Sequence, residues 1–174
     1  MQVKSDLADR PFLDLSGTSG CAAYQFRRTS RAVARLYDAA LAPSGIRSTQ
    51  FALLTAIAKL QPVAISRVAG ILVIDLTTMT RSLKLLQIEG LVEIAPRGVR
   101  RQRLLTLTSK AEKALAAAVP LWRAMQARFL AELGKKWPEF REELEQAAKV
   151  ALALETTDSA GDKPNLAGES QRPG

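Results

Sequence analysis

One stretch near the middle of the chain, DLTTMTRSLKLLQIEGLV, constrains the fold more than any other. Asp75 is a typical N-cap residue, because its carboxylate can accept from the free N–H groups of a helix start. Met79, Leu83 and Leu86 follow at spacings of four and three, which puts them on one apolar face of a helix. Gly90 is typical of a left-handed helix end. The stretch therefore predicts an amphipathic helix that begins at Asp75 and stops at Gly90.

The opposite face of this helix begins with small polar and basic side chains. These are Thr77, Thr78, Thr80, Arg81 and Lys84. A shorter helix predicted in AISRVAGILV, with Ser66 as its N-cap, precedes it and would brace it at a steep angle. A helix held in this way fits the major groove of DNA, where such side chains reach base edges. The simpler alternative is a solvated helix start.

A basic hairpin is predicted directly after the helix. The segment LVEIA alternates in polarity, PRGVRRQ is a basic turn, and RLLTLT is suited to a second strand. The tip carries four arginines: Arg97, Arg100, Arg101 and Arg103. They can reach backbone phosphates or the minor groove beside the helix, although an ordinary charged loop has the same composition.

Four further helices are predicted around this unit. The first runs from about Cys21 to Leu41, capped by Thr18 or Ser19, with an apolar stripe that includes Phe26 and Leu36. The second is capped by Ser48 and ends before Pro62, and we expect its inward residues to be Phe51, Leu54, Ile57 and Ala58.

The last two helices follow the hairpin. A capping box of Ser109 and Glu112 starts a long helix that ends at Gly134. Pro138 suits the first turn of the final helix. The predicted organisation is a flexible arm over 1–17, one domain over 18–155 and a disordered tail over 156–174. The fold class is mostly α with a small β-hairpin wing.

The charge distribution points to a polyanionic partner. The net charge is +8, and residues 21–134 hold 17 basic and 6 acidic side chains, whereas both ends are slightly acidic. Double-stranded DNA is the first candidate partner and an anionic membrane surface the second. An amphipathic helix with a basic polar face and no wing would favour the membrane.

The residue types that are missing narrow the function further. The chain has no histidine, which removes histidine acid–base chemistry and histidine metal sites, and the 6 acids of residues 21–134 form no obvious catalytic pair. We therefore expect no enzyme, metal or cofactor. A single cysteine cannot form an intrachain disulfide, which fits a cytoplasmic location. There is no apolar run of bilayer length, and the N-terminus does not have the pattern of a secretory signal.

The order of these elements resembles the MarR family of winged-helix repressors. The resemblance covers residues 21 to about 154 and is most specific in ISRVAGILVIDLTTMTRSLKLLQIEGLVE and LTSKAEKAL. It implies an obligate homodimer built from the first helix and the last two. It also implies a base-reading face with Thr77, Thr78, Arg81 and Lys84, and a wing with Arg97, Arg100 and Arg101. That family often has glycine at the helix–helix turn; Val73 here indicates a longer or less tight turn.

Three other features have both a structural and a functional interpretation. Trp122, Met125 and Phe129 fit a dimer core or a ligand pocket. Four arginines of the first helix form a solvated face or attract an anionic effector: Arg27, Arg28, Arg31 and Arg35. Cys21 is either a small apolar residue or a redox sensor. The sensor interpretation rests on the helix start, which stabilises the thiolate, and on the stretch, which resembles the first helix of MarR-family peroxide sensors. Tyr24 fits that pattern, whereas Tyr37 lies two residues beyond the expected place.

The sequence as a whole predicts a cytoplasmic, dimeric, sequence-specific DNA-binding regulator. It would act as a repressor on a pseudo-palindromic operator and be released by a small molecule or an oxidant. The alternative within the same class is a basic architectural protein without an effector, which would have little preference among DNA sequences. A membrane-surface protein is the alternative from a different class.

Overall fold

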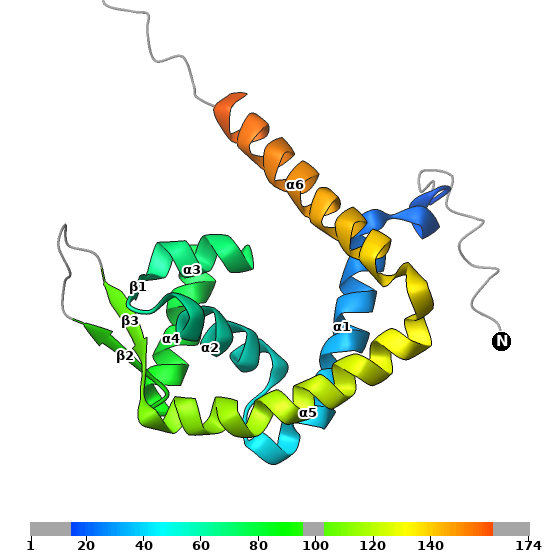
Figure 1. The fold of residues 1–174 in the computed structure, drawn as a ribbon. Helices are drawn as coiled ribbons and strands as arrows, with labels where there is room; N and C mark the ends of the chain where they lie inside the picture. The colour runs from blue at the N-terminus through cyan, green and yellow to red at the C-terminus, as the bar shows by residue number, and fades with distance from the viewer. Residues whose placement is uncertain (1–14, 96–102, 162–174) are drawn as a thin grey trace, which may run out of the picture. The chain divides into compact units, whose positions relative to one another are not determined.

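The computed structural model describes residues 15–95 and 103–161 of the chain (Figure 1). They fall into two compact units, one up to Met125 and one from Gln126 onward. Within the described ranges, no helix is both long enough and apolar enough to cross a bilayer. The wing arginines Arg97, Arg100 and Arg101 lie outside these ranges.

The first unit combines helices with a small antiparallel sheet, and this confirms the predicted fold class (Figure 1). Its helices are α1 (Ala22–Leu41), α2 (Ser48–Leu60), α3 (Ile65–Leu72), α4 (Leu76–Ile88) and the first part of α5 (Ser109–Leu133). The strands are β1 (Val63–Ala64), β2 (Val92–Ala95) and β3 (Leu104–Leu107). Short 3₁₀ turns precede and follow α1 at Thr18–Gly20 and Ala42–Ser44.

Helix α4 forms as its sequence predicts. The Asp75 side chain accepts a hydrogen bond from the backbone N of Thr78 at 2.8 Å. Met79, Leu83 and Leu86 are buried in the core of the unit. Gly90 adopts a φ of 68°, and the next residue donates its N–H to the carbonyl of Leu86 at 2.8 Å. Local signals within one segment were therefore sufficient to define this helix.

The turn between α3 and α4 is tight, so the prediction of a looser turn was wrong. Val73 adopts the left-handed conformation, with φ 52° and ψ 49°, that glycine usually takes at a helix end. The backbone N of Ile74 reaches the carbonyl of Ala69 at 2.9 Å, which closes the helix end. A β-branched residue is strained in this conformation. The turn therefore has the geometry that a glycine would give it, and the backbone of Val73 is strained as a result.

The predicted hairpin forms, and the sheet has one more strand than the sequence suggested. Strands β2 and β3 pair antiparallel, with Val92 opposite Leu107. Strand β1, which was not predicted, pairs with the other edge of β3 and sets Val63 opposite Leu105. Both of these residues are buried. Strand β3 is therefore the central strand, and it ties the segment before α3 to the wing.

Two helix starts are capped differently from the prediction. Ser48 is the first residue of α2 and does not cap it; its backbone N and hydroxyl both donate to the Asp38 carboxylate of α1. For α5, the cap is Thr108 rather than Ser109, because the Thr108 hydroxyl oxygen accepts from the backbone N of Ala111 at 3.2 Å. The same hydroxyl donates to the Gly90 carbonyl at 2.7 Å.

Three smaller assignments were also wrong. Thr18 does not cap α1, because its hydroxyl donates to the carbonyl of Leu15. Cys21 occupies the N-cap position and makes no side-chain cap bond. Ser66 lies inside α3, whose N-cap is Ala64. On α2, Ala58 is exposed, and the buried alanine is Ala56.

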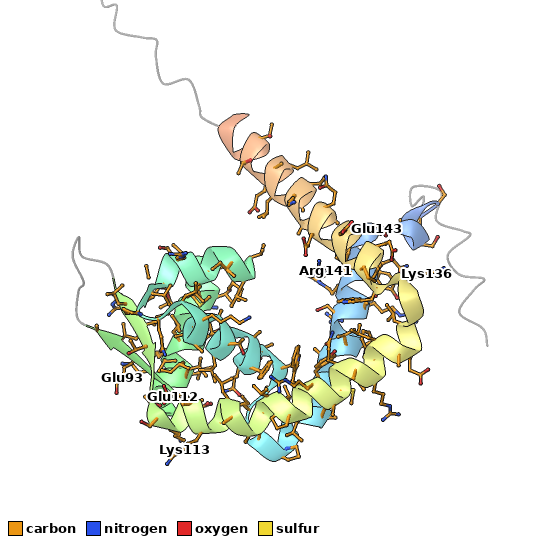
Figure 2. All side chains as sticks on the ribbon, in the orientation of Figure 1. Glu93, Glu112, Lys113, Lys136, Arg141 and Glu143 are labelled. Carbon is orange, nitrogen blue, oxygen red and sulfur yellow. The ribbon has the colours of Figure 1, made fainter. Side chains whose placement is uncertain are left out.

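The second unit contains the end of α5, the 3₁₀ turn Gly134–Lys136 and helix α6 (Trp137–Gly161). Gly134 has a φ of 77°, as expected for the residue that ends α5. Helix α6 continues past residue 155, where the sequence predicted the disordered tail to begin. Arg141, labelled in Figure 2, lies 3.7 Å from the Glu145 carboxylate one turn further along α6.

Candidate nucleic-acid interface

The outward face of α4 carries the predicted reading residues. Thr77, Arg81 and Lys84 are all exposed. They lie at spacings of four and three, and therefore on one side of the helix. That side is opposite the buried Met79 and Leu83. The core fixes the rotation of α4 about its axis, and these three side chains consequently point to solvent.

A groove of about 380 Å³ runs between α4 and the sheet. Thr80, Lys84 and Gln87 line it from the helix. Ala95 of β2 and Arg103, the residue before β3, line it from the wing. The sequence analysis identified Thr80, Lys84 and Arg103 but missed Gln87. Its signal was available, because Gln87 lies two turns after Thr80 on the same side of the helix. The groove brings two cations and two hydrogen-bonding side chains together on one side of α4.

Thr78 lies on the other side of α4. It lines a second groove, of about 580 Å³, whose opposite wall is the start of α2 with Arg47 and Gln50. The Gln50 side chain spans this groove by donating from Nε2 to the Glu89 carboxylate at 2.8 Å and accepting from the backbone N of Arg47 at 2.9 Å. Arg47 is a cation that the sequence analysis did not select, because only the packing of α2 brings it near α4.

Asp75 places a negative charge at the start of α4. Hydrogen bonds from Thr78, as a side-chain partner and through its backbone N–H, lower the pKa of the Asp75 carboxyl below its ordinary value. The carboxylate therefore stays ionised and remains hydrogen-bonded to the N-terminus of α4. Its bond to the Thr78 backbone N leaves the side chains of Thr77 and Arg81 free to face outward.

Arg103 is the wing arginine that the described residues include. It is exposed and directly precedes β3, and its carbonyl accepts from the backbone N of Ile65 at 3.4 Å. This bond ties the base of the wing to the start of α3. Glu93 on β2, labelled in Figure 2, is the exposed acid of the same hairpin.

The candidate redox residue, Cys21, is exposed at the start of α1. Its carbonyl accepts from the backbone N of Gln25 at 3.1 Å, as an N-cap residue should. Tyr24 and Arg28 are exposed on the same helix. Tyr37 is partly buried, and this burial raises the pKa of its phenol. Cys21 is thus an accessible thiol in the single chain and not a core residue.

The candidate pocket residues divide between the two units. Trp122 is partly buried in the first unit and stacks on Phe51, with ring centroids 5.9 Å apart and an interplanar angle of 26°. Met125 is the last residue of that unit, whereas Phe129 belongs to the second. All three side chains are partly buried. The Phe51 contact gives Trp122 a packing role within the first unit.

Fold and site together define a winged helix–turn–helix protein with exposed basic side chains on α4 and beside the wing. The transcriptional regulator MosR of M. tuberculosis, solved in complex with DNA, is 36% identical to this chain. The match covers 77% of this chain and 98% of that one, with a TM-score of 0.72. The chain therefore belongs to the MarR family of winged-helix transcriptional regulators.

Two more distant structures have the same fold. A mutant MarR from E. coli complexed with operator DNA is 21% identical, with a TM-score of 0.67, and the match covers 78% of this chain and 99% of that one. The transcriptional repressor CouR, bound to a 23-mer DNA duplex, is 23% identical, with a TM-score of 0.63 over 80% and 98% of the two chains. Comparison of the sequence with protein-family models found no match, and comparison with curated protein sequences found none either.

Proposed function

We propose that the protein is a sequence-specific transcriptional repressor that binds a pseudo-palindromic operator as a homodimer. The observation that carries this proposal is the exposed face of α4, where Thr77, Arg81 and Lys84 are held outward by the buried stripe beneath them. Arginine is well suited to this role, because its two terminal N–H groups match the major-groove edge of guanine. The DNA-bound state of MosR supports the same interpretation.

The wing supplies the second set of contacts in this proposal. Arg103 is exposed at the base of the hairpin, and three more arginines precede it in the tip sequence: Arg97, Arg100 and Arg101. Arginines beside a recognition helix bind phosphates or enter the narrow minor groove, which adds affinity without much sequence information. We assign base reading mainly to α4 and backbone binding mainly to the wing.

Release from DNA is proposed to follow a shift between two dimer states. In one state the spacing of the two recognition helices fits DNA, and in the other it does not. A ligand that binds the second state more tightly lowers operator affinity, by no more than the ratio of its affinities for the two states. A small molecule or an oxidant can supply that preference. The exposed thiol of Cys21 is the candidate for the oxidant, and the arginines of α1 are candidates for an anionic effector. We further propose a cytoplasmic location and no enzymatic activity.

Selection from random DNA fragments tests the proposal. The purified protein should retain fragments that share two inverted half-sites about one helical turn, roughly 34 Å, apart. Retention without a shared sequence would favour an architectural DNA-binding protein. Flotation with anionic vesicles but no retention of DNA would favour the membrane-surface alternative.

A further inference from the structure

Large apolar side chains are exposed at the start of the reading helix. Leu76, the first residue of α4, is 57% exposed, and Val73 in the preceding turn is also 57% exposed. Leu76 directly precedes Thr77 of the polar reading face, and its exposed apolar surface is unfavourable in water. The Leu76 side chain is therefore well placed to contact an apolar group on a partner.

Leu76 belongs to a definite row of side chains. Residues 76, 80 and 84 are spaced by four, so Leu76, Thr80 and Lys84 follow one another along one side of α4. Thr80 and Lys84 line the groove beside the wing. Leu76 thus stands at the N-terminal end of that row, and the N-terminal residues of a recognition helix are those that approach base edges.

Thr80 makes the row more apolar than its sequence suggests. Its hydroxyl donates to the carbonyl of Leu76 at 2.7 Å, within α4 itself. The hydroxyl proton is therefore already used, and Thr80 retains its methyl group and oxygen lone pairs for a partner. Together, Leu76 and Thr80 form a short apolar strip beside the polar strip of Thr77 and Arg81.

In the major groove, the apolar feature of a base pair is the C5-methyl group of thymine. We propose that Leu76 contacts this methyl group and is a specificity-determining residue, with the Thr80 methyl beside it. This inference rests on the proposed DNA-binding function and adds a base preference to it. The operator half-site should contain a thymine next to the bases that Thr77 and Arg81 reach.

Deoxyuridine tests this directly, because it differs from thymidine by the methyl group alone. Each thymine of a selected half-site is replaced by uracil in turn, and the Kd is measured for the native chain. One replacement should weaken binding by about three- to fivefold, as expected for one buried methyl group. No effect at any thymine of the half-site would overturn the inference.

Variants then assign the methyl contact to its residue. Leu76→Ala should bind the native and uracil-substituted sites equally at that position while keeping the native response elsewhere. Thr80→Val, which keeps a methyl group, should keep the ratio of the affinities for the thymine and uracil sites, whatever its effect on the affinity for both. Ile88→Ala is the matched control, because Ile88 is 73% exposed on α4 but about 18 Å further along its axis. It should keep the full discrimination of thymine from uracil.

The outcomes separate the two proposals. If Leu76→Ala still discriminates thymine from uracil as the native chain does, this inference is wrong and DNA binding stands. If the native chain retains no DNA sequence in the selection, the proposed function fails, and this inference fails with it. A partial folding defect in the Leu76 variant weakens its apparent affinity for both sites alike, so it can neither produce nor remove the discrimination of thymine from uracil.

Discussion

The Asp38 carboxylate of α1 accepts two hydrogen bonds from Ser48, the first residue of α2. The backbone N of Ser48 lies 2.7 Å and its hydroxyl oxygen 2.6 Å from the same oxygen of Asp38. Asp38 therefore caps a helix to which it does not belong. These bonds lower the pKa of the Asp38 carboxyl below its ordinary value of 3.8. The Asp38 side chain thus links α1 to the start of α2, which borders the second groove.

Replacing Asp38 should destabilise the protein in a pH-dependent way. Asp38→Ala should lower the free energy of unfolding at pH 7 by about 1 kcal/mol, the usual cost of a lost cap. Because the folded pKa is depressed, the contribution is complete above the unfolded pKa and is lost as the pH falls through the folded pKa. Urea unfolding of both chains at pH 7 and near pH 3 checks this; an equal difference at both values would contradict it.

Replacing Val73 by glycine should stabilise the fold. The left-handed conformation costs a non-glycine residue about 1–2 kcal/mol. Glycine has no such strain, but its extra loss of chain entropy on folding costs about 0.5–1 kcal/mol. Val73→Gly should therefore raise the free energy of unfolding by about 0.5–1 kcal/mol in chemical denaturation at fixed protein concentration.

Gly45 provides the reverse control for the same effect. It has a φ of 76°, and an added Cβ would meet nothing within 4 Å, so Gly45→Ala introduces backbone strain without a clash. It should cost about 1 kcal/mol. If Gly45→Ala is destabilising but Val73→Gly is destabilising too, Val73 is held by contacts that outweigh its strain.

The sequence predicted those elements whose signals lie within one segment. The cap, the apolar spacing and the glycine stop of α4 are all local, and the structure confirms each one. The cap of α2 could not be predicted in the same way, because its acceptor, Asp38, comes from another helix. Strand β1 was missed since two residues, Val63 and Ala64, carry no alternating pattern and become a strand only by pairing with β3.

The site, like the fold, could be predicted from the sequence where its signal lies within one helix. The outward direction of Thr77 and Arg81 follows from helical periodicity, so it could be predicted from the sequence. Gln87 had the same periodic signal and was missed, whereas Arg47 could be assigned to its groove only after α2 had packed beside α4. The strain at Val73 depends on its positive φ, which the residue type does not predict.

Arg81 and Arg103 should affect DNA binding differently. Arg81→Ala should cost about 1–3 kcal/mol on the selected operator and relax the sequence preference, because a base contact is lost. Arg103→Ala should weaken selected and unrelated DNA alike and reduce the salt dependence by about one counterion. Titrations on both DNAs at several salt concentrations measure these effects.

Lys113, an exposed lysine on α5 (Figure 2), is the matched control for charge. Lys113→Ala removes one positive charge and should change neither the preference nor the salt dependence. If Arg81→Ala leaves the preference for the selected operator unchanged, the assignment of α4 as the reading helix is wrong.

Cys21 should make DNA binding sensitive to an organic hydroperoxide. It is the single cysteine of the chain and is exposed at the start of α1. Oxidation of the thiol adds polar atoms at that position. A stoichiometric hydroperoxide should lower the operator affinity of the native chain and leave that of Cys21→Ser unchanged, with recovery after a thiol reductant. If neither chain responds, Cys21 has no part in release from DNA.

The apolar surfaces of α1 and α6 should make the native chain a dimer. Large apolar side chains are exposed on both helices: Phe26, Leu36, Phe140, Val150 and Leu154. Covering such area contributes about 25 cal/mol per Å², so a second copy that buries these side chains stabilises the assembly. Light scattering should give a dimer at micromolar concentration.

A single acidic substitution on α6 should weaken that dimer. Leu154 is 62% exposed in the single chain, and Leu154→Glu would place an unpaired carboxylate in the interface. The variant should shift toward monomer and lose affinity for a two-half-site operator. Ile88→Glu makes the same change on α4, outside the proposed interface, and should remain dimeric. A folded native monomer at micromolar concentration would contradict the dimer, and with it an operator read by two α4 helices.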